Sequence, residues 1–523
     1  MTFDVLIKGG TILDGIAKEG QLLDVGISGR EIKAVGDLRE ARAGLTIEAA
    51  EKYVAPGFID IQSHSDSYLT LLDISTQDSL VAQGITTIAV GHCGTSLAPL
   101  ASPDALKSVQ KWHSLAGANI NWQTFEEYLT ALDRHPLGVN VLSLVGHATL
   151  RRGLLGDEVR PATGEEVAMM SSLLKQSLKS GAAGMSLGLI YSHEVDASAS
   201  ELEATARLVA DSRKLLSVHL RSESGHIVEA LEEAIGLAKV AKARLKISHF
   251  KIQGRKNWDL LDQALGSLDR GYQQGVDVFF DVYPYTTSWT VLYTYLPRWS
   301  YEGGRAGILR HLAEPSSRQR ILSYLRALDQ DLASIFVATS ETNPAFVGKN
   351  LAQIAANQEV SIEEALLNVL SATSSQVVVF DHNLSSEVLM TLLGHPLSVV
   401  ASDGAGYDLN YPSVQGLVHP RCFGTMPRFL SLVRDQKLMG WAAAIKKITS
   451  RPAEKLGLRK RGRLAPGMFA DLVVFDPRDI GSRASYENPY QAADGIAYVL
   501  VNGSVSFSSQ GGAGKPAGQV LRV

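Results

Sequence analysis

Eight short runs of β-branched and other apolar residues, separated by helical patterns, constrain the fold of this chain more than any other feature. The runs are Gly57–His64, Thr86–Cys93, Val139–His147, Ala183–Gly188, Leu215–Arg221, Arg244–Phe250, Val276–Tyr285 and Leu397–Gly404. The segments between them carry apolar residues at helical spacing, as Ile227, Leu231 and Ala234 do in "HIVEALEEAIGLAKVAK". Strands that alternate with helices pair in parallel, and eight such units close into a barrel. We therefore predict an α/β fold with a (β/α)8 barrel over residues 56–454.

The chain ends and the last crossover do not fit the barrel pattern. Residues 1–55 alternate as strands with glycine turns, and residues 455–523 repeat this pattern in "MFADLVVFDPRD". We expect the two ends to pair in a small β-sandwich beside the barrel. The crossover between the seventh and eighth runs is roughly a hundred residues long, far beyond an ordinary βα connection. It predicts an inserted cap at about residues 290–350.

Composition excludes several classes of function. Of 523 residues, 45% are apolar, yet no apolar run reaches the roughly 18 residues that a membrane helix needs. The net charge is −4 with scattered Lys and Arg residues, so we expect no nucleic-acid or membrane partner. The N-terminus shows no secretory pattern and there are only two cysteines, which favours a reducing, cytoplasmic location. A small-molecule substrate fits this composition best.

Chemically active side chains gather at the predicted carboxyl ends of the strands. They are His64, Cys93, His147, His219, His249, Tyr283 and Asp403. Active sites of such barrels lie at that face, because the loops following the strands converge there. A single buried histidine is usually structural, but several at equivalent strand ends favour a metal site.

The residue types indicate which metal this would be. A thiolate with two imidazoles suits a borderline-soft ion with tetrahedral preference, so we predict zinc on Cys93, His219 and His249. Three protein ligands leave one position open, and bound zinc lowers the pKa of water to about 7 and polarises a carbonyl. The alternative for Cys93 is a small buried hydrophobe, the role we assign to Cys422.

Asp403, in "ASDG" at the end of the eighth run, is the candidate proton carrier. It is placed to take a proton from the attacking water and to pass it to the leaving nitrogen. The competing interpretation is an Asp that caps the following helix or turn. Its position at a strand end favours catalysis.

The order of motifs over nearly the whole chain resembles the N-acyl-D-amino-acid deacylases, or D-aminoacylases, of the amidohydrolase superfamily. The matching stretches include "APGFIDIQSHSD", "TTIAVGHCGTSLAP", "SVHLRSES", "ISHFK", "DVYPYT" and "HPRCFGTMPRFL". The resemblance implies a zinc-dependent hydrolase that cleaves N-acyl-D-amino acids to a carboxylate and a free amine. Cys93 is the discriminating residue, since most other amidohydrolases use a carboxylated lysine in its place.

Carried over to this sequence, the resemblance supports the predicted zinc ligands and Asp403. It further implies that Arg221, Lys251 and Tyr283 bind the α-carboxylate of the substrate, for which guanidinium and ammonium groups are suited. The alternative for Arg221 and Lys251 is a surface charge.

Two departures from the family pattern bear on the site. The usual His-x-His becomes Gln62-x-His64, so we expect one tightly bound zinc and a second site on His64 that is weak or absent. We expect Gln62 to hold water or to orient His64, and His147 to support the ligands from behind. Trp289 stands where the family has a small serine, which predicts bulky or aromatic substrates.

Two rival functions remain at this stage. A cyclic-amide hydrolase of the hydantoinase or dihydroorotase kind would share the barrel, but it needs two metals bridged by a modified lysine. A non-catalytic scaffold is motivated by Gln62 and Trp289. The retained Cys93, His219, His249 and Asp403 favour the hydrolase.

Overall fold

A parallel barrel forms the centre of the molecule. The computed structural model describes residues 2–110, 115, 117–328, 330–340, 342–409 and 416–523. Its barrel strands are β6 (Phe58–Asp60), β7 (Ile85–Val90), β8 (Asn140–Ser143) with β9 (Val145–Gly146), β10 (Gly184–Gly188), β11 (Leu215–His219), β12 (Arg244–Ile247), β13 (Val278–Val282) and β17 (Ser398–Val400). They pair in parallel as β6-β7-β8 and as β9-β10-β11-β12-β13-β17. A parallel bridge between Ser63 and Gly404 joins the first strand position to the last. The predicted (β/α)8 barrel is confirmed.

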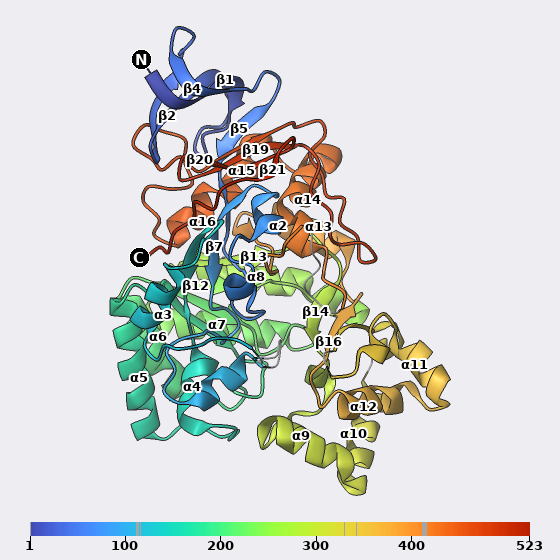
Figure 1. Cartoon of the computed structure of the whole chain (residues 1–523). Coiled ribbons are helices and arrows are strands. Elements are labelled where there is room, and N and C mark those ends of the chain that lie inside the picture. The colour runs from blue at the N-terminus through green and yellow to red at the C-terminus, as the bar shows by residue number, and fades with distance from the viewer. Residues whose placement is uncertain (1, 111–114, 116, 329, 341, 410–415) are drawn as a thin grey trace.

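Helices cover the outside of the barrel (Figure 1). They include α3 (Phe125–Leu132), α4 (His147–Leu155), α5 (Gly164–Lys179), α6 (Ala199–Asp211), α7 (Ile227–Ala241), α8 (Leu261–Gln273), α13 (Ser386–Gly394), α14 (Arg421–Gln436), α15 (Trp441–Ile448) and α16 (Ser450–Lys455). In α7 the residues that recur at helical spacing, among them Ile227, Leu231 and Ala234, are buried as predicted. None of the described helices is both long and apolar enough to cross a membrane.

The two chain ends share one nine-stranded sheet at the top of Figure 1. Its strands are β1 (Thr2–Ile12), β2 (Gln21–Ser28), β3 (Glu31–Gly36), β4 (Arg42–Glu48), β5 (Tyr53–Pro56), β18 (Leu472–Phe475), β19 (Ile496–Val501), β20 (Ser504–Ser508) and β21 (Gly512–Ala513). β5 joins the two halves because it pairs with β1 on one side and with β18 on the other. The two chain ends therefore pair with each other, as predicted, through continuous hydrogen bonding, and the small β-sandwich itself stays a prediction.

The predicted insertion is a small α/β unit beside the barrel, at the lower right of Figure 1. It contains the antiparallel strands β14 (Ser288–Val291), β15 (Phe336–Thr339) and β16 (Val378–Asp381), with helices α9 (Gly304–Ala313), α10 (Pro315–Ala327), α11 (Leu351–Gln358) and α12 (Ile362–Ala372). It extends past the predicted end near residue 350, because β16 returns between β14 and β15 to complete the sheet.

Candidate metal centre

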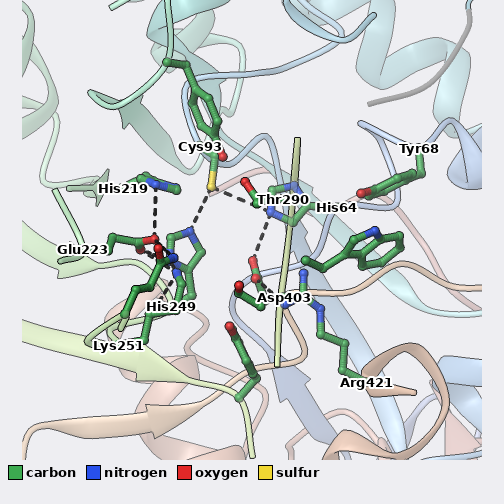
Figure 2. Close-up of a pocket in the computed structure, with 15 residues that line it drawn as sticks. His64, Tyr68, Cys93, His219, Glu223, His249, Lys251, Thr290, Asp403 and Arg421 are labelled. Atoms are coloured by element: carbon green, nitrogen blue, oxygen red, sulfur yellow. Dashed lines mark hydrogen bonds and ion pairs between the residues drawn. The ribbon is translucent and has the colours of Figure 1, made fainter. Parts of the chain in front are cut away.

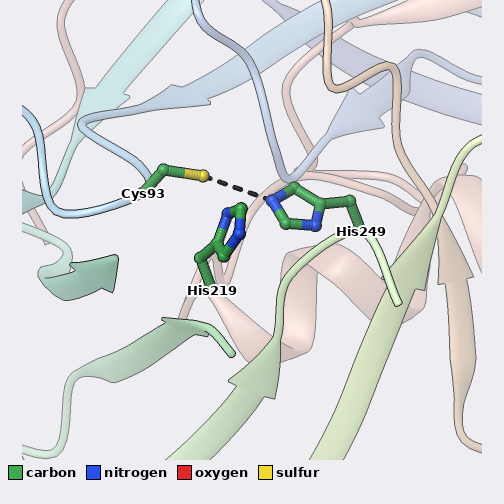
Figure 3. Close-up of side chains that lie close together, drawn as sticks. All are labelled: Cys93, His219 and His249. Carbon is green, nitrogen blue, oxygen red and sulfur yellow. Dashed lines mark hydrogen bonds between the residues drawn. The ribbon is translucent and has the colours of Figure 1, made fainter. Parts of the chain in front are cut away.

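Cys93, His219 and His249 come together at the carboxyl ends of β7, β11 and β12 (Figure 3). Their ligand atoms all lie within 4.8 Å of one another, and all three residues are buried. Cys93 Sγ is 3.3 Å from His249 Nε2. The structure therefore assembles the three predicted ligands around one point.

The backbone at these positions is unusual. Cys93 has φ 53°, His249 has φ 35° and Asp403 has φ 50°. All three lie in the left-handed region of backbone conformation, which residues other than glycine rarely adopt. Such conformations persist where the surrounding structure enforces them, and they cluster at functional sites. At the neighbouring Gly94 a Cβ atom would lie 1.9 Å from Glu194 Oε2, so this turn requires glycine.

The charges around the cluster suit a cation. Burial alone would raise the pKa of the Cys93 thiol, but His249 and His219 beside it hold that pKa well below its usual value. Burial and Lys251 oppose protonation of His249, yet the negative charges around it, Asp403 foremost, raise its pKa to about 10. A metal ion would neutralise this concentration of negative charge, and a thiolate with imidazole nitrogens is a donor set that zinc prefers.

Glu223 lies behind His249 and was not among the predicted site residues. Its Oε1 lies 3.0 Å from His249 Nδ1 and 2.5 Å from Lys251 Nζ. The contact at Nδ1 leaves His249 Nε2 directed at Cys93, which is how carboxylates commonly fix a metal-bound imidazole. Its position two residues after Arg221, in "HLRSES", was the available signal.

Asp403 follows β17 and faces the cluster across the pocket (Figure 2). His64 Nε2 lies 3.1 Å from its Oδ1, and Arg421 Nη1 lies 2.9 Å from its Oδ2. Burial raises the pKa of Asp403, but Arg421 and His249 outweigh it and hold that pKa well below the usual range. Arg421, in the motif "HPRCFGTMPRFL", was not among the predicted site residues.

Three of the four predicted substrate-binding residues line this pocket, namely Lys251, Tyr283 and Trp289. Arg421 lies over the rings of Tyr283 and Trp289, with its guanidinium carbon 4.8 and 5.3 Å from their centroids. The Trp289 ring stacks on Tyr68 with 4.8 Å between centroids.

Arg221 lies elsewhere. Its guanidinium donates to Glu233 on α7, with Nη2 2.8 Å from Oε1, and Arg221 is not among the described residues that line the pocket. Arg221 comes two residues after His219 in the sequence. β11 ends at that histidine, so residues two apart no longer need to face the same way.

The remaining predicted residues lie around the cluster. His64 Nε2 is 3.8 Å from Cys93 Sγ, at the side of the cluster that faces Asp403. His147 Nδ1 lies 2.9 Å from Glu194 Oε1, and the other oxygen of Glu194 lies close to Gly94, so His147 lies behind the Cys93–Gly94 turn. The Gln62 amide nitrogen lies 3.5 Å from Cys93 Sγ and 3.3 Å from Asp403 Oδ1.

Comparison with known proteins agrees with this geometry. The model of the amidohydrolase family matches residues 45–244 and 372–507. D-Aminoacylase from Alcaligenes xylosoxydans xylosoxydans is 32% identical over 520 residues, which cover 99% of this chain and 97% of that protein. A solved D-aminoacylase structure, described in terms of one-metal activation and second-metal attenuation, superposes with a TM-score of 0.85 at 32% identity over 100% of both chains. N-Acyl-D-glutamate deacylase from Bordetella bronchiseptica, solved with zinc and a phosphonate that mimics the tetrahedral intermediate, gives the same three values.

Proposed function

The chain belongs to the amidohydrolase family, and we propose that it hydrolyses N-acyl-D-amino acids with one zinc ion held by Cys93, His219 and His249. The observation that carries the proposal is this ligand cluster facing an ionised Asp403, in a chain that is 32% identical to D-aminoacylase over its whole length. The products are a carboxylate and a free amine.

A zinc ion at this cluster would polarise the carbonyl of the substrate and acidify a water molecule. Asp403 then moves the proton. Its Oδ2 faces Arg421, and its Oδ1 faces His64 and the Gln62 amide. The ionised carboxylate accepts a proton from the attacking water. The new C–O bond forms as the water gives up this proton, and Asp403 then returns the proton to the amide nitrogen as the C–N bond breaks.

Unpartnered donors in the pocket wall support recognition of a carboxylate. Arg421 Nε, the Tyr283 hydroxyl and Trp289 Nε1 are buried without a hydrogen-bond partner among the described residues. Buried donors of this kind are costly unless a ligand satisfies them, and the α-carboxylate of an N-acyl amino acid offers acceptors for all three. The indole N–H of Trp289 thus supplies a donor where the family has a serine hydroxyl.

The charge balance of the pocket favours substrates with neutral side chains. Its two lysine and arginine side chains, Lys251 and Arg421, each already face one carboxylate, Glu223 and Asp403. Once the α-carboxylate is bound, a second acidic group would find no further lysine or arginine among the described lining residues. The rings of Tyr68, Tyr191 and Trp289 instead offer apolar contact, which suits bulky or aromatic side chains.

The test is zinc content measured together with turnover of matched N-acetyl-D- and N-acetyl-L-amino acids. We expect about one zinc per chain, turnover of the D-enantiomers only, and higher kcat/KM for N-acetyl-D-phenylalanine than for N-acetyl-D-glutamate. Turnover of hydantoins with two bound metals would indicate the cyclic-amide hydrolase instead. A chain with neither zinc nor turnover would be a scaffold.

A further inference from the structure

A buried lysine lies directly behind the metal centre. Lys246 points from β12 into the barrel, where its side chain is 0% exposed. Its Nζ lies 2.5 Å from Asp281 Oδ2 on the neighbouring β13. Lys246 also donates a hydrogen bond to Gln62 Oε1. A buried ammonium group destabilises the fold unless it is paired, and these two contacts provide the pairing.

Lys246 decides which way the Gln62 amide faces. An ammonium group can only donate hydrogen bonds, so the amide oxygen of Gln62 must be turned toward it. The amide NH2 group then faces the opposite way, 3.5 Å from Cys93 Sγ and 3.3 Å from Asp403 Oδ1. A cysteine sulfur and a carboxylate oxygen both accept hydrogen bonds from an amide NH2 group. In this orientation the amide oxygen accepts from Lys246 and the NH2 group donates to Cys93 and Asp403. In the flipped orientation, donor would face donor and acceptor would face acceptor.

The same two acceptors define where a second cation could bind beside the zinc. His64 Nε2 also approaches them, at 3.8 Å from Cys93 Sγ and 3.1 Å from Asp403 Oδ1. A second ion would have to lie among these three groups. The Gln62 amide directs its hydrogens at two of them, with the positive charge of Lys246 behind it.

We propose that the Lys246–Gln62 pair stands in for a second cation: it holds Cys93 and Asp403 by hydrogen bonds and keeps the centre mononuclear. The inference rests on one part of the proposed function, namely that Cys93, His219 and His249 hold a first zinc ion. It makes Lys246 a positioning residue that acts through Gln62. It also implies that a histidine at position 62 is not enough to restore a second metal site. The imidazole ring would lie beside the ammonium of Lys246, whose positive charge opposes a second cation.

The experiment compares second-ion affinity in Gln62→His and in the double variant Gln62→His/Lys246→Met. Zinc per chain is counted after dialysis, and further zinc is titrated by calorimetry. We expect the double variant to bind the second ion on the order of tenfold or more tightly than Gln62→His. The matched control is Gln62→His/Lys447→Met, because Lys447 is also buried but donates to Ser398 at the opposite end of β17. Equal affinity in all three variants would overturn the proposal.

Two measurements keep the proposal falsifiable if the double variant does not fold. The native chain must hold one zinc, and two tightly bound ions in it would refute the inference. Gln62→Glu keeps a partner for Lys246 but replaces the NH2 donor with an anionic oxygen, so it should gain a second ion. If it still holds only one zinc, the orientation argument fails. Zinc counting needs no substrate, so these outcomes are independent of whether the chain hydrolyses N-acyl-D-amino acids.

Discussion

Replacing Trp289 with serine tests whether the insertion selects the substrate. Trp289 lies on β14, only 6% exposed, and its ring stacks on Tyr68. Serine retains a hydrogen-bond donor for the α-carboxylate and removes the aromatic wall. We therefore expect Trp289→Ser to lower the preference for N-acetyl-D-phenylalanine over N-acetyl-D-alanine.

The size of the effect follows from the contacts that would be lost. An aromatic pair contributes about 0.5 to 1.5 kcal/mol beyond area burial. Losing roughly 60 Å² of apolar contact with the substrate ring, at about 25 cal/mol per Å², adds about 1.5 kcal/mol. The sum, about 2 to 3 kcal/mol, corresponds to roughly a 30- to 150-fold fall in the ratio of kcat/KM values.

The assay measures kcat/KM for both substrates at a temperature where the variant is folded, since removing a buried indole costs about 3 to 5 kcal/mol of stability. Trp299→Ser is the matched control. Trp299 lies in the same insertion, partly buried under Arg320, whose guanidinium carbon is 4.3 Å from its ring centroid, and it does not line the pocket among the described residues. It should leave the ratio unchanged. An unchanged ratio in Trp289→Ser, with zinc and fold retained, would refute the assignment of Trp289 to the side-chain wall.

Three further substitutions test the centre itself. Cys93→Ala should lose zinc on dialysis and lose activity, because two imidazoles remain to hold the ion; stoichiometric zinc with full activity would contradict the ligand set. Asp403→Asn should keep zinc while kcat falls roughly 10²- to 10⁴-fold, since an amide cannot carry the proton; a native rate would exclude Asp403 as the proton carrier. Tyr283→Phe removes a buried hydroxyl that has no partner among the described residues, so stability should not fall. It should raise KM by about 3- to 10-fold for N-acetyl-D-phenylalanine but not for the corresponding α-amide, and an equal change for both would place the hydroxyl away from the carboxylate.

The sequence predicted best those residues whose positions follow from strand order. Cys93, His219 and His249 each stand at or just after the end of a barrel strand, and parallel strands in a closed barrel bring these ends together. The same reasoning located Asp403 beyond β17. A local sequence pattern is sufficient here, because residues at the carboxyl ends of successive barrel strands all lie around the same face of the barrel.

The sequence pattern was least useful for site residues whose positions depend on side-chain direction in loops or on contacts between distant parts of the chain. Arg221 lies two residues beyond His219, but the strand ends there and the guanidinium turns to Glu233. Arg421 begins α14, and only the packing of this helix against the pocket brings it to Asp403. Lys246 is separated from Gln62 by 184 positions, so no local pattern links them.

The residues of the site come from two parts of the fold, and this division indicates how reaction chemistry and substrate selectivity can vary separately. The proposed zinc ligands and Asp403 come from barrel strand ends, whose spacing is fixed by the hydrogen bonds between strands. Ser288, Trp289 and Thr290, in contrast, reach the same pocket from β14 of the insertion, which has its own sheet. A substitution there changes the wall of the pocket and leaves the strands that carry the proposed ligands in place. Two contacts limit this independence. Arg421, which faces Asp403, lies over the Trp289 ring. Trp289 also stacks on Tyr68, which follows β6 only four residues after His64. A change at Trp289 is therefore transmitted to the centre along the loop that carries His64, the side on which the Lys246–Gln62 pair also acts.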